Sequence, residues 1–358
     1  MKARTIPVID VAEFARLHRE NPRLLHDSPW IISGYIQDWP SYAAWQDLGV
    51  LRQRFGHIDA FAKAPNFVTH RRANLVSVET DFSRYLDYIE QPGRVRELYE
   101  GRWLDGSYEA FAAQDLPLYC GTLRFVHRAD DPTFAEVSPL VPPPLRPLNH
   151  ALPYYYSLFN HLWLLVSLPG ALTPLHVDNN GTIAMIAQLR GRKRATLYSP
   201  ADLAHVYQPG IGFMDPEAPD DSEFPTWRQA TAWHAELQPG QVLYVGTEWA
   251  HHVRTLETSV SVSFDFVDET NLASYATSPD WATVLGQRVK ARPDTLLQKL
   301  DSHLHATDPA TLPAVELGRK VMRAILASSL PATKDGHLAA VRASYLRHLD
   351  KLMMQGAA

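Results

Sequence analysis

The chain has 358 residues, 46% of them hydrophobic and 20% charged, so it can bury the core of one large domain or two modest ones. Its net charge of -5 provides no electrostatic basis for binding nucleic acid, which is therefore disfavoured as a partner. The single cysteine, Cys120, excludes an internal disulfide and a cysteine-based zinc cluster, and we expect it to be a small buried residue. The sequence contains no run of about 18 apolar residues, so no membrane span is predicted. The first residues lack a signal-peptide pattern, so a cytoplasmic protein is expected.

Residues 1–116 are predicted to form a mixed α/β elaboration of the main domain. The segment "PWIISGYI" indicates a strand, and "YAAWQDLGVLRQRFG" indicates a helix that Gly56 closes. The segment "DFSRYLDYIEQP" is typical of a short helix that ends before a proline.

Residues 117–268 change to short apolar runs with Pro and Gly between them rather than inside them. The predicted strands are "TLRFVH", "LWLLVSL", "TIAMIAQLRG", "RKRATLYSP", "GQVLYVG" and "SVSVSFDFV". This pattern is typical of an antiparallel sandwich or barrel.

Residues 269–358 are predicted to be helical. Ser278 and Pro279 match an N-cap followed by proline at the first helical position. Apolar residues then recur at helical spacing in two stripes, Leu296 to Leu304 and Leu338 to Leu352. These stripes could cover the sheet domain or join two copies of the chain, and we expect a homodimer because isologous pairs are the commonest oligomers.

A candidate metal site lies in "LTPLHVDNNGTIAMIAQLRGRKRATLYSP". Residues i and i+2 of a strand point to the same side, so His176 and Asp178 can both face a barrel interior. A third ligand is expected from "LQPGQVLYVGTEWAHHV", where His251 and His252 open a strand and only one of them can face inward. Two histidines and one carboxylate form the ligand set of non-heme Fe(II) oxygenases.

Together these segments resemble the Jumonji-C, or cupin-like, 2-oxoglutarate oxygenase family over roughly residues 6–268. "TPLHVD" is similar to the family's first-ligand motif, and "LQPGQVLYVGTEWAHHV" to its second, in which a tryptophan precedes the ligand by two residues. "SPWIISGYIQDWPSYAAW" is similar to its lead-in strand and Asp-Trp-Pro turn. The resemblance implies a mainly β fold, a double-stranded β-helix (jelly-roll, cupin-like) core. It also implies His176, Asp178 and His251 as catalytic metal ligands, with His252 facing away.

The resemblance also implies a site for the cosubstrate 2-oxoglutarate. Lys193 matches the lysyl-hydroxylase branch's lysine within a similar "HxDxxGT…GxK" frame, while Arg192 and Arg194 should point outward. Cofactor-binding hydroxyls are expected from Ser263, Thr173 and Tyr119.

Two positions depart from the family pattern. Asp265 stands where asparagine is frequent near the metal, and Ile186 replaces an asparagine of the lysyl-hydroxylase branch. The substrate class of that branch is therefore not carried over to this chain.

The function implied by the resemblance is an Fe(II)- and 2-oxoglutarate-dependent dioxygenase that uses O2 to hydroxylate an unactivated C–H bond. The substrate is expected to be a protein or peptide side chain or a small metabolite. Two alternatives remain open: a catalytically silent cupin-like protein used for binding or scaffolding, and a cupin of another chemistry, although such cupins usually bind metal through three or four histidines.

Overall fold

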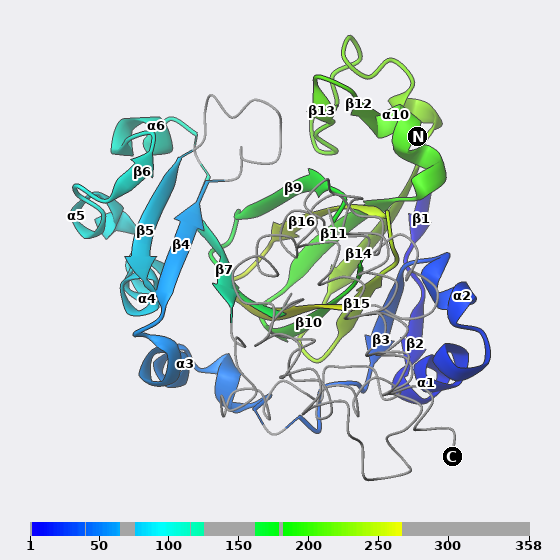
Figure 1. Ribbon diagram of the computed structural model, residues 1–358, viewed down its shortest axis with the longest axis horizontal. Helices are drawn as coiled ribbons and strands as arrows, with labels where there is room; N and C mark the ends of the chain where they lie inside the picture. The colour runs from blue at the N-terminus through cyan, green and yellow to red at the C-terminus, as the bar shows by residue number, and fades with distance from the viewer. Residues whose placement is uncertain are drawn as a thin grey trace, which may run out of the picture.

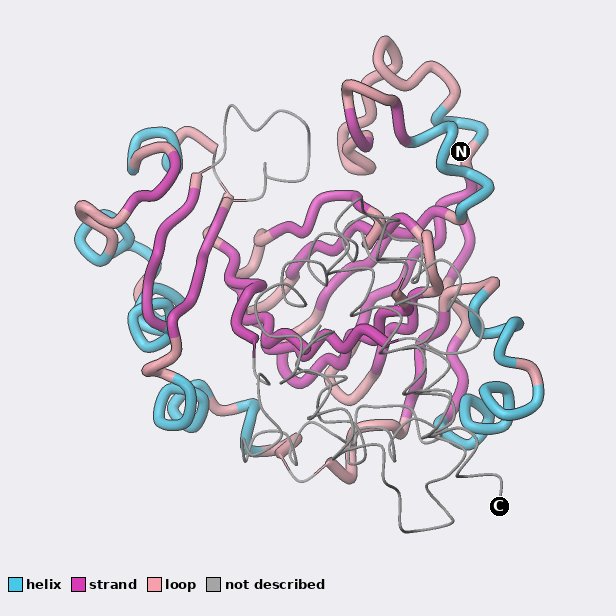
Figure 2. The backbone as a smooth tube through the Cα atoms, viewed as in Figure 1, coloured by secondary structure: helices cyan, strands magenta, loops and turns pink. Residues whose placement is uncertain are grey.

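Two β-sheets that face each other form the centre of the protein, and short helices lie around them (Figures 1 and 2). The computed structural model describes residues 2–39, 41–64, 76–114, 116–124, 162–178 and 182–266. The helices predicted after residue 268, and the dimer surface assigned to them, lie outside the described residues. The expected dimer therefore stays a prediction.

The larger sheet has ten strands, and their order in the sheet differs from their order in the chain. From one edge to the other its strands are β2 (Val8–Asp10), β3 (Trp30–Ser33), β15 (Val242–Val245), β10 (Ile183–Arg190), β17 (Ser259–Phe266), β8 (Leu162–Ser167), β7 (Tyr119–Arg124), β4 (Asp59–Lys63), β5 (Ser77–Asp81) and β6 (Trp103–Asp105). Strand β4 pairs with β7 through Ala62 and Cys120. One sheet therefore runs across the boundary predicted at residues 116/117, which itself stays a prediction.

The smaller sheet has five strands and carries most of the candidate metal site. Its order is β1 (Lys2–Thr5), β14 (Thr231–Leu237), β11 (Lys193–Tyr198), β16 (Ala250–Thr255) and β9 (Leu172–His176). A separate ribbon pairs β12 (Tyr207–Gln208) with β13 (Gly212–Phe213). Strand β14 was not predicted, because its segment "TAWHAEL" mixes polar and apolar residues without strict alternation.

The helices lie mainly on the outer side of the larger sheet. They are α1 (Val11–Glu20), α2 (Pro22–His26), α3 (Leu48–Phe55), α4 (Phe82–Glu90), α5 (Val95–Leu98), α6 (Tyr108–Ala112) and α10 (Leu203–Val206), with short 3-10 turns at Ala44–Gln46, Pro92–Arg94, Pro200–Asp202 and Trp227–Gln229. Apolar residues of α1, α3 and α4 pack with the outward residues of β8, β10 and β17. Within the described ranges, no helix is long and apolar enough to cross a membrane.

The helix predicted from "YAAWQDLGVLRQRFG" is two helices rather than one. The chain breaks at Asp47, whose backbone is extended and whose carboxylate accepts a hydrogen bond from Gly49 N at 2.7 Å. A side-chain acceptor at this position satisfies an amide that lacks a helical partner, so a new helix begins there. The strand at Trp30–Ser33 and the helix at Phe82–Glu90 are as predicted.

The space between the two sheets is partly apolar. Ala195 and Leu197 of β11 and Val253 of β16 pack with Ala184 and Ile186 of β10. Because side chains of a strand alternate, residues two apart from these also face inward, including Lys193 and His251. The predicted strands at β8, β10, β11, β15 and β17 are all present, and the observed fold is the mainly β, double-stranded β-helix expected from the sequence.

The turn between β10 and β11 depends on Gly191. Its φ of +68° is in the left-handed region, and a Cβ there would clash with the backbone oxygen of Thr258. A side chain is thus opposed by both backbone conformation and space. This glycine lets the chain reverse two residues before Lys193.

Candidate functional site

His176, Asp178 and His251 come together at one end of the space between the sheets. His176 ends β9 and aligns with His251 of β16 in the antiparallel pairing. The Nε2 atom of His176 lies 3.5 Å from Asp178 Oδ1, and the Nε2 atom of His251 lies 3.9 Å from Asp178 Oδ2. One donor atom from each residue lies within 4.8 Å of the others, which is close enough for one metal ion to contact all three.

Backbone carbonyls orient both imidazoles. His176 Nδ1 donates to Pro174 O at 2.9 Å, and His251 Nδ1 donates to Trp249 O at 3.2 Å. A carbonyl oxygen only accepts hydrogen bonds, so in the neutral rings the proton is on Nδ1 and the lone pair is on Nε2. Both lone pairs therefore meet the Asp178 carboxylate, and only a proton or a metal cation can make this arrangement favourable. The donor set fits a divalent transition metal.

The two histidines differ in how readily they take a proton. Burial lowers the pKa of His251 to about 4, and the neighbouring His176 acts in the same direction. Burial also acts to lower the pKa of His176, but its hydrogen bond to Asp178 and the charge of that carboxylate raise it overall. The cluster thus holds His251 as a neutral imidazole, the form that binds a metal.

His252 lies on the opposite face of β16 from His251. It aligns with Thr196 of β11, and its Nε2 atom lies 3.4 Å from Glu217 Oε1 on the outer side of the smaller sheet. The structure thus separates the two histidines as the alternation of a strand predicts.

Lys193 lies on the inward face of β11, deep between the sheets. The residue is only 3% exposed, and burial lowers the pKa of its ammonium group to about 7. Among the described residues no carboxylate pairs with it, and burial alone shifts its pKa. By contrast, Arg192 pairs with Glu257 at 2.8 Å and Arg194 with Glu236 at 3.2 Å, both towards solvent. A buried and unpaired ammonium group is a candidate for binding an anion.

A row of hydroxyl groups extends from the level of Lys193 to two other predicted residues. Lys193 aligns with Thr255, whose Oγ1 lies 2.9 Å from Ser167 Oγ across the space between the sheets. Ser167 aligns with Tyr119 of β7, whose side chain hydrogen bonds to Thr173. Burial raises the pKa of Tyr119 to about 12, so its hydroxyl keeps its proton.

Ser263 lies in a different part of the interior from Tyr119 and Thr173. On β17 it aligns with Ile186 and with Trp163 and hydrogen bonds to Asp265. Burial and the charge of Asp178 raise the pKa of Asp265 well above its ordinary range. Ser263 and Asp265 therefore belong to the end of the interior that holds His176, Asp178 and His251.

A further set of buried polar residues was not predicted. The Gln188 side chain donates to Ser259 Oγ at 3.0 Å and accepts from Ser261 Oγ at 2.8 Å. The serines alternate in "SVSVSFDF", and this period of two was a signal that they share one inward face.

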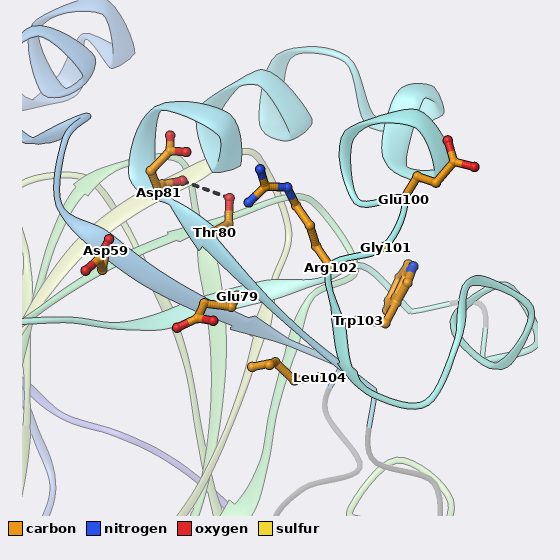
Figure 3. A pocket seen from close by; sticks show the side chains of 9 residues that line it. All are labelled: Asp59, Glu79, Thr80, Asp81, Glu100, Gly101, Arg102, Trp103 and Leu104. Carbon is orange, nitrogen blue, oxygen red and sulfur yellow. Dashed lines mark hydrogen bonds between the residues drawn. The ribbon is translucent and has the colours of Figure 1, made fainter.

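An open cavity of about 620 Å³ lies elsewhere, beside strands β4 to β6 (Figure 3). Its lining includes Asp59, Glu79, Glu100 and Arg102, and none of its residues belongs to the cluster around Asp178. It lacks histidine and is not part of the candidate metal site.

Comparison with known proteins places the chain in a family. A family model described as "Cupin-like domain" matches residues 19–271. Lysine-specific demethylase 8 of Xenopus tropicalis is 37% identical over 101 residues, which are 26% of this chain and 22% of that protein. tRNA wybutosine-synthesizing protein 5 of Danio rerio is 32% identical over 100 residues, 27% of this chain and 30% of that protein.

A longer but weaker match covers more of the chain. Jumonji C domain-containing protein 5 of Drosophila melanogaster is 24% identical over 251 residues, 66% of this chain and 54% of that protein. The first relatives are matched over less than a third of their own length, so their activities do not transfer as wholes. Since the cupin-like model covers most of the sequence and relatives of the Jumonji-C type match within it, this chain belongs to the cupin-like domain family with its Jumonji-C members.

Proposed function

We propose that this protein is an Fe(II)- and 2-oxoglutarate-dependent dioxygenase that hydroxylates an unactivated C–H bond. The observation that carries the proposal is the cluster in which two Nε2 lone pairs and one carboxylate converge while both Nδ1 atoms are tied to backbone carbonyls. Two imidazoles and a carboxylate on one side of a metal leave positions open for a cosubstrate and O2.

The proposed metal ligands are His176, Asp178 and His251. The hydrogen bonds at Nδ1 hold each ring in the orientation that presents Nε2, and such outer contacts raise the basicity of a ligand histidine. Iron bound there would supply the redox chemistry in which O2 oxidises 2-oxoglutarate to succinate and CO2. One oxygen atom of O2 enters succinate, and the other is inserted into the substrate C–H bond.

Lys193 would bind the distal carboxylate of 2-oxoglutarate. It aligns with Thr255 and lies four residues from Leu197, which aligns with His251. Four strand residues span about 13 Å, a gap that an extended lysine side chain and a short dicarboxylate can bridge together. Tyr119 and Thr173, linked by their own hydrogen bond, and Ser263, near the metal end, are the proposed hydroxyl contacts.

The substrate would be a protein or peptide side chain or a small metabolite. One relative is named as a demethylase and another as a tRNA wybutosine-synthesizing protein, so the relatives' names span more than one substrate type. We also propose that the protein is cytoplasmic and forms a homodimer.

The deciding experiment loads the protein with Fe(II) and measures succinate formed from 2-oxoglutarate in air, with and without cell extract. Dependence of succinate on iron, and extract products heavier by one oxygen atom, would support the hydroxylase. A protein that binds iron but forms no succinate above the iron-only control, even with extract, would instead be the catalytically silent cupin-like protein.

A further inference from the structure

A second group of metal-binding side chains lies on the outer face of the smaller sheet. It consists of His252 of β16 with Asp215 and Glu217, which belong to the segment 199–230 between β11 and β14. One donor atom from each residue lies within 4.8 Å of the others. The same segment packs Val206 and Met214 against Tyr198 and Ala250, so it covers this face of the sheet.

His252 is buried without the hydrogen bonds that a buried imidazole normally makes. The residue is 2% exposed, and within the described part of the chain neither Nδ1 nor Nε2 makes a hydrogen bond of normal geometry. The contact of Nε2 is with Glu217 Oε1 at 3.4 Å, and one oxygen of Asp215 lies within 4.8 Å of both groups, so the ring is directed at the two carboxylates. Buried polar groups are nearly always paired, and one that is not calls for an explanation such as an ion.

The carboxylates keep lone pairs for a further contact. Arg254 donates to both oxygens of Glu217, with its Nε atom 2.7 Å from Oε1. Each carboxylate oxygen has two lone pairs, so these bonds leave one on each oxygen. Asp215 Oδ1 accepts from Glu217 N at 2.9 Å, which leaves the other oxygen of Asp215 available. Two carboxylates and one guanidinium give the group one net negative charge.

We propose that His252, Asp215 and Glu217 bind a second divalent transition-metal ion of the Zn²⁺ type, separate from the space between the sheets. One imidazole nitrogen and carboxylate oxygens are ordinary zinc ligands, and the exposure of Asp215 allows water to complete the coordination. The ion would join the segment 199–230 to the strand that carries His251, and would stabilise the folded chain because the unfolded chain has no such site. This inference does not rest on the proposed function.

The test removes the first site and asks whether an ion still binds. The full chain carrying His176→Ala and Asp178→Ala is stripped with a chelator, dialysed and titrated calorimetrically with ZnCl2. One ion per chain is expected. Adding Asp215→Asn should weaken its binding at least about tenfold, the usual effect of disturbing a metal site. Adding His252→Ala should also weaken it.

A matched control and a second readout complete the test. Glu236→Gln removes another carboxylate of the same sheet, one that pairs with Arg192 and Arg194, and should leave zinc affinity unchanged. X-ray absorption at the zinc edge should show nitrogen and oxygen ligands in the double variant and a change on Asp215→Asn. Asp215→Asn leaves the Glu217–Arg254 pair intact, so it decides the question if His252→Ala fails to fold. No zinc bound by the double variant, or a zinc affinity that Asp215→Asn does not change, would overturn the proposal, and the three residues would then be only an ion-paired contact between the segment 199–230 and β16.

Discussion

His251 and His252 are adjacent in β16 but serve opposite faces of the smaller sheet. His251 aligns with His176 and lies with it beside Asp178, whereas His252 is directed at Glu217. One peptide unit therefore separates the proposed catalytic metal site from the proposed second site.

His251→Ala should abolish 2-oxoglutarate turnover, because two remaining ligands hold a divalent ion poorly. His252→Ala should retain measurable turnover, since its ring does not face the interior. Succinate formation by the two iron-loaded variants measures the difference. An inactive His252→Ala protein beside an active His251→Ala protein would reverse the assignment of the ligand.

Lys193→Ala should raise the 2-oxoglutarate concentration needed for half-maximal turnover by roughly one to two orders of magnitude. The reason is the loss of a charge-assisted contact of about 1.5–3 kcal/mol. Arg194→Ala is the matched control, because this neighbouring cation faces solvent and pairs with Glu236. An equal change in the required 2-oxoglutarate concentration in both variants would show that Lys193 does not bind the cosubstrate.

The affinity for 2-oxoglutarate should fall as pH rises above about 7. Burial lowers the pKa of Lys193 to about 7, so the free protein loses this positive charge above that pH and must recover a proton to bind the dianion. Calorimetric titration between pH 6 and about 9 should show this fall in affinity in the native protein and not in the Lys193→Met protein. A trend that persists in the variant would assign it to another group.

Lys193→Met should also increase the free energy of unfolding, most of all below pH 7. The folded-state pKa lies below the unfolded value of 10.5, so between these values the unfolded chain binds more protons and the stability of the native protein rises with pH. The penalty for burying the charge is therefore largest at low pH, and methionine removes it. Urea unfolding of both proteins at pH 6 and about 9 measures the difference. A smaller gain at pH 6 than at the higher pH would contradict the expected sign.

Gly191→Ala should destabilise the protein more than Gly101→Ala does. Both glycines have a φ of +68°, so alanine costs about 1–2 kcal/mol at either position through its backbone conformation. A Cβ at Gly191 would in addition clash with Thr258 O, whereas nothing lies within 4 Å of one at Gly101. Urea unfolding gives both losses, and equal values would show that the β10–β11 turn relaxes freely. The larger loss should come with weaker 2-oxoglutarate binding, because the turn positions Lys193.

Local patterns were enough to predict much of this architecture. The spacing of His176 and Asp178 and the alternating serines of β17 have the period of two that a strand imposes, whereas β8 and β10 are continuous apolar runs typical of buried strands, and a Pro-Gly turn precedes β15. The same alternation predicted that His251 and His252 would face apart. Strand β14 was not predicted because its inward and outward positions both mix polar and apolar residues.

The sequence by itself therefore determined which residues share a strand face, because that depends on neighbours a few residues away. Only the tertiary structure decided which strands meet, since pairing joins residues far apart in the chain. The β9–β16 pairing brings His176 level with His251, and the contact between β8 and β16 joins Ser167 to Thr255. The packing of segment 199–230 on the sheet likewise places Asp215 and Glu217 beside His252, a contact that no local period encodes.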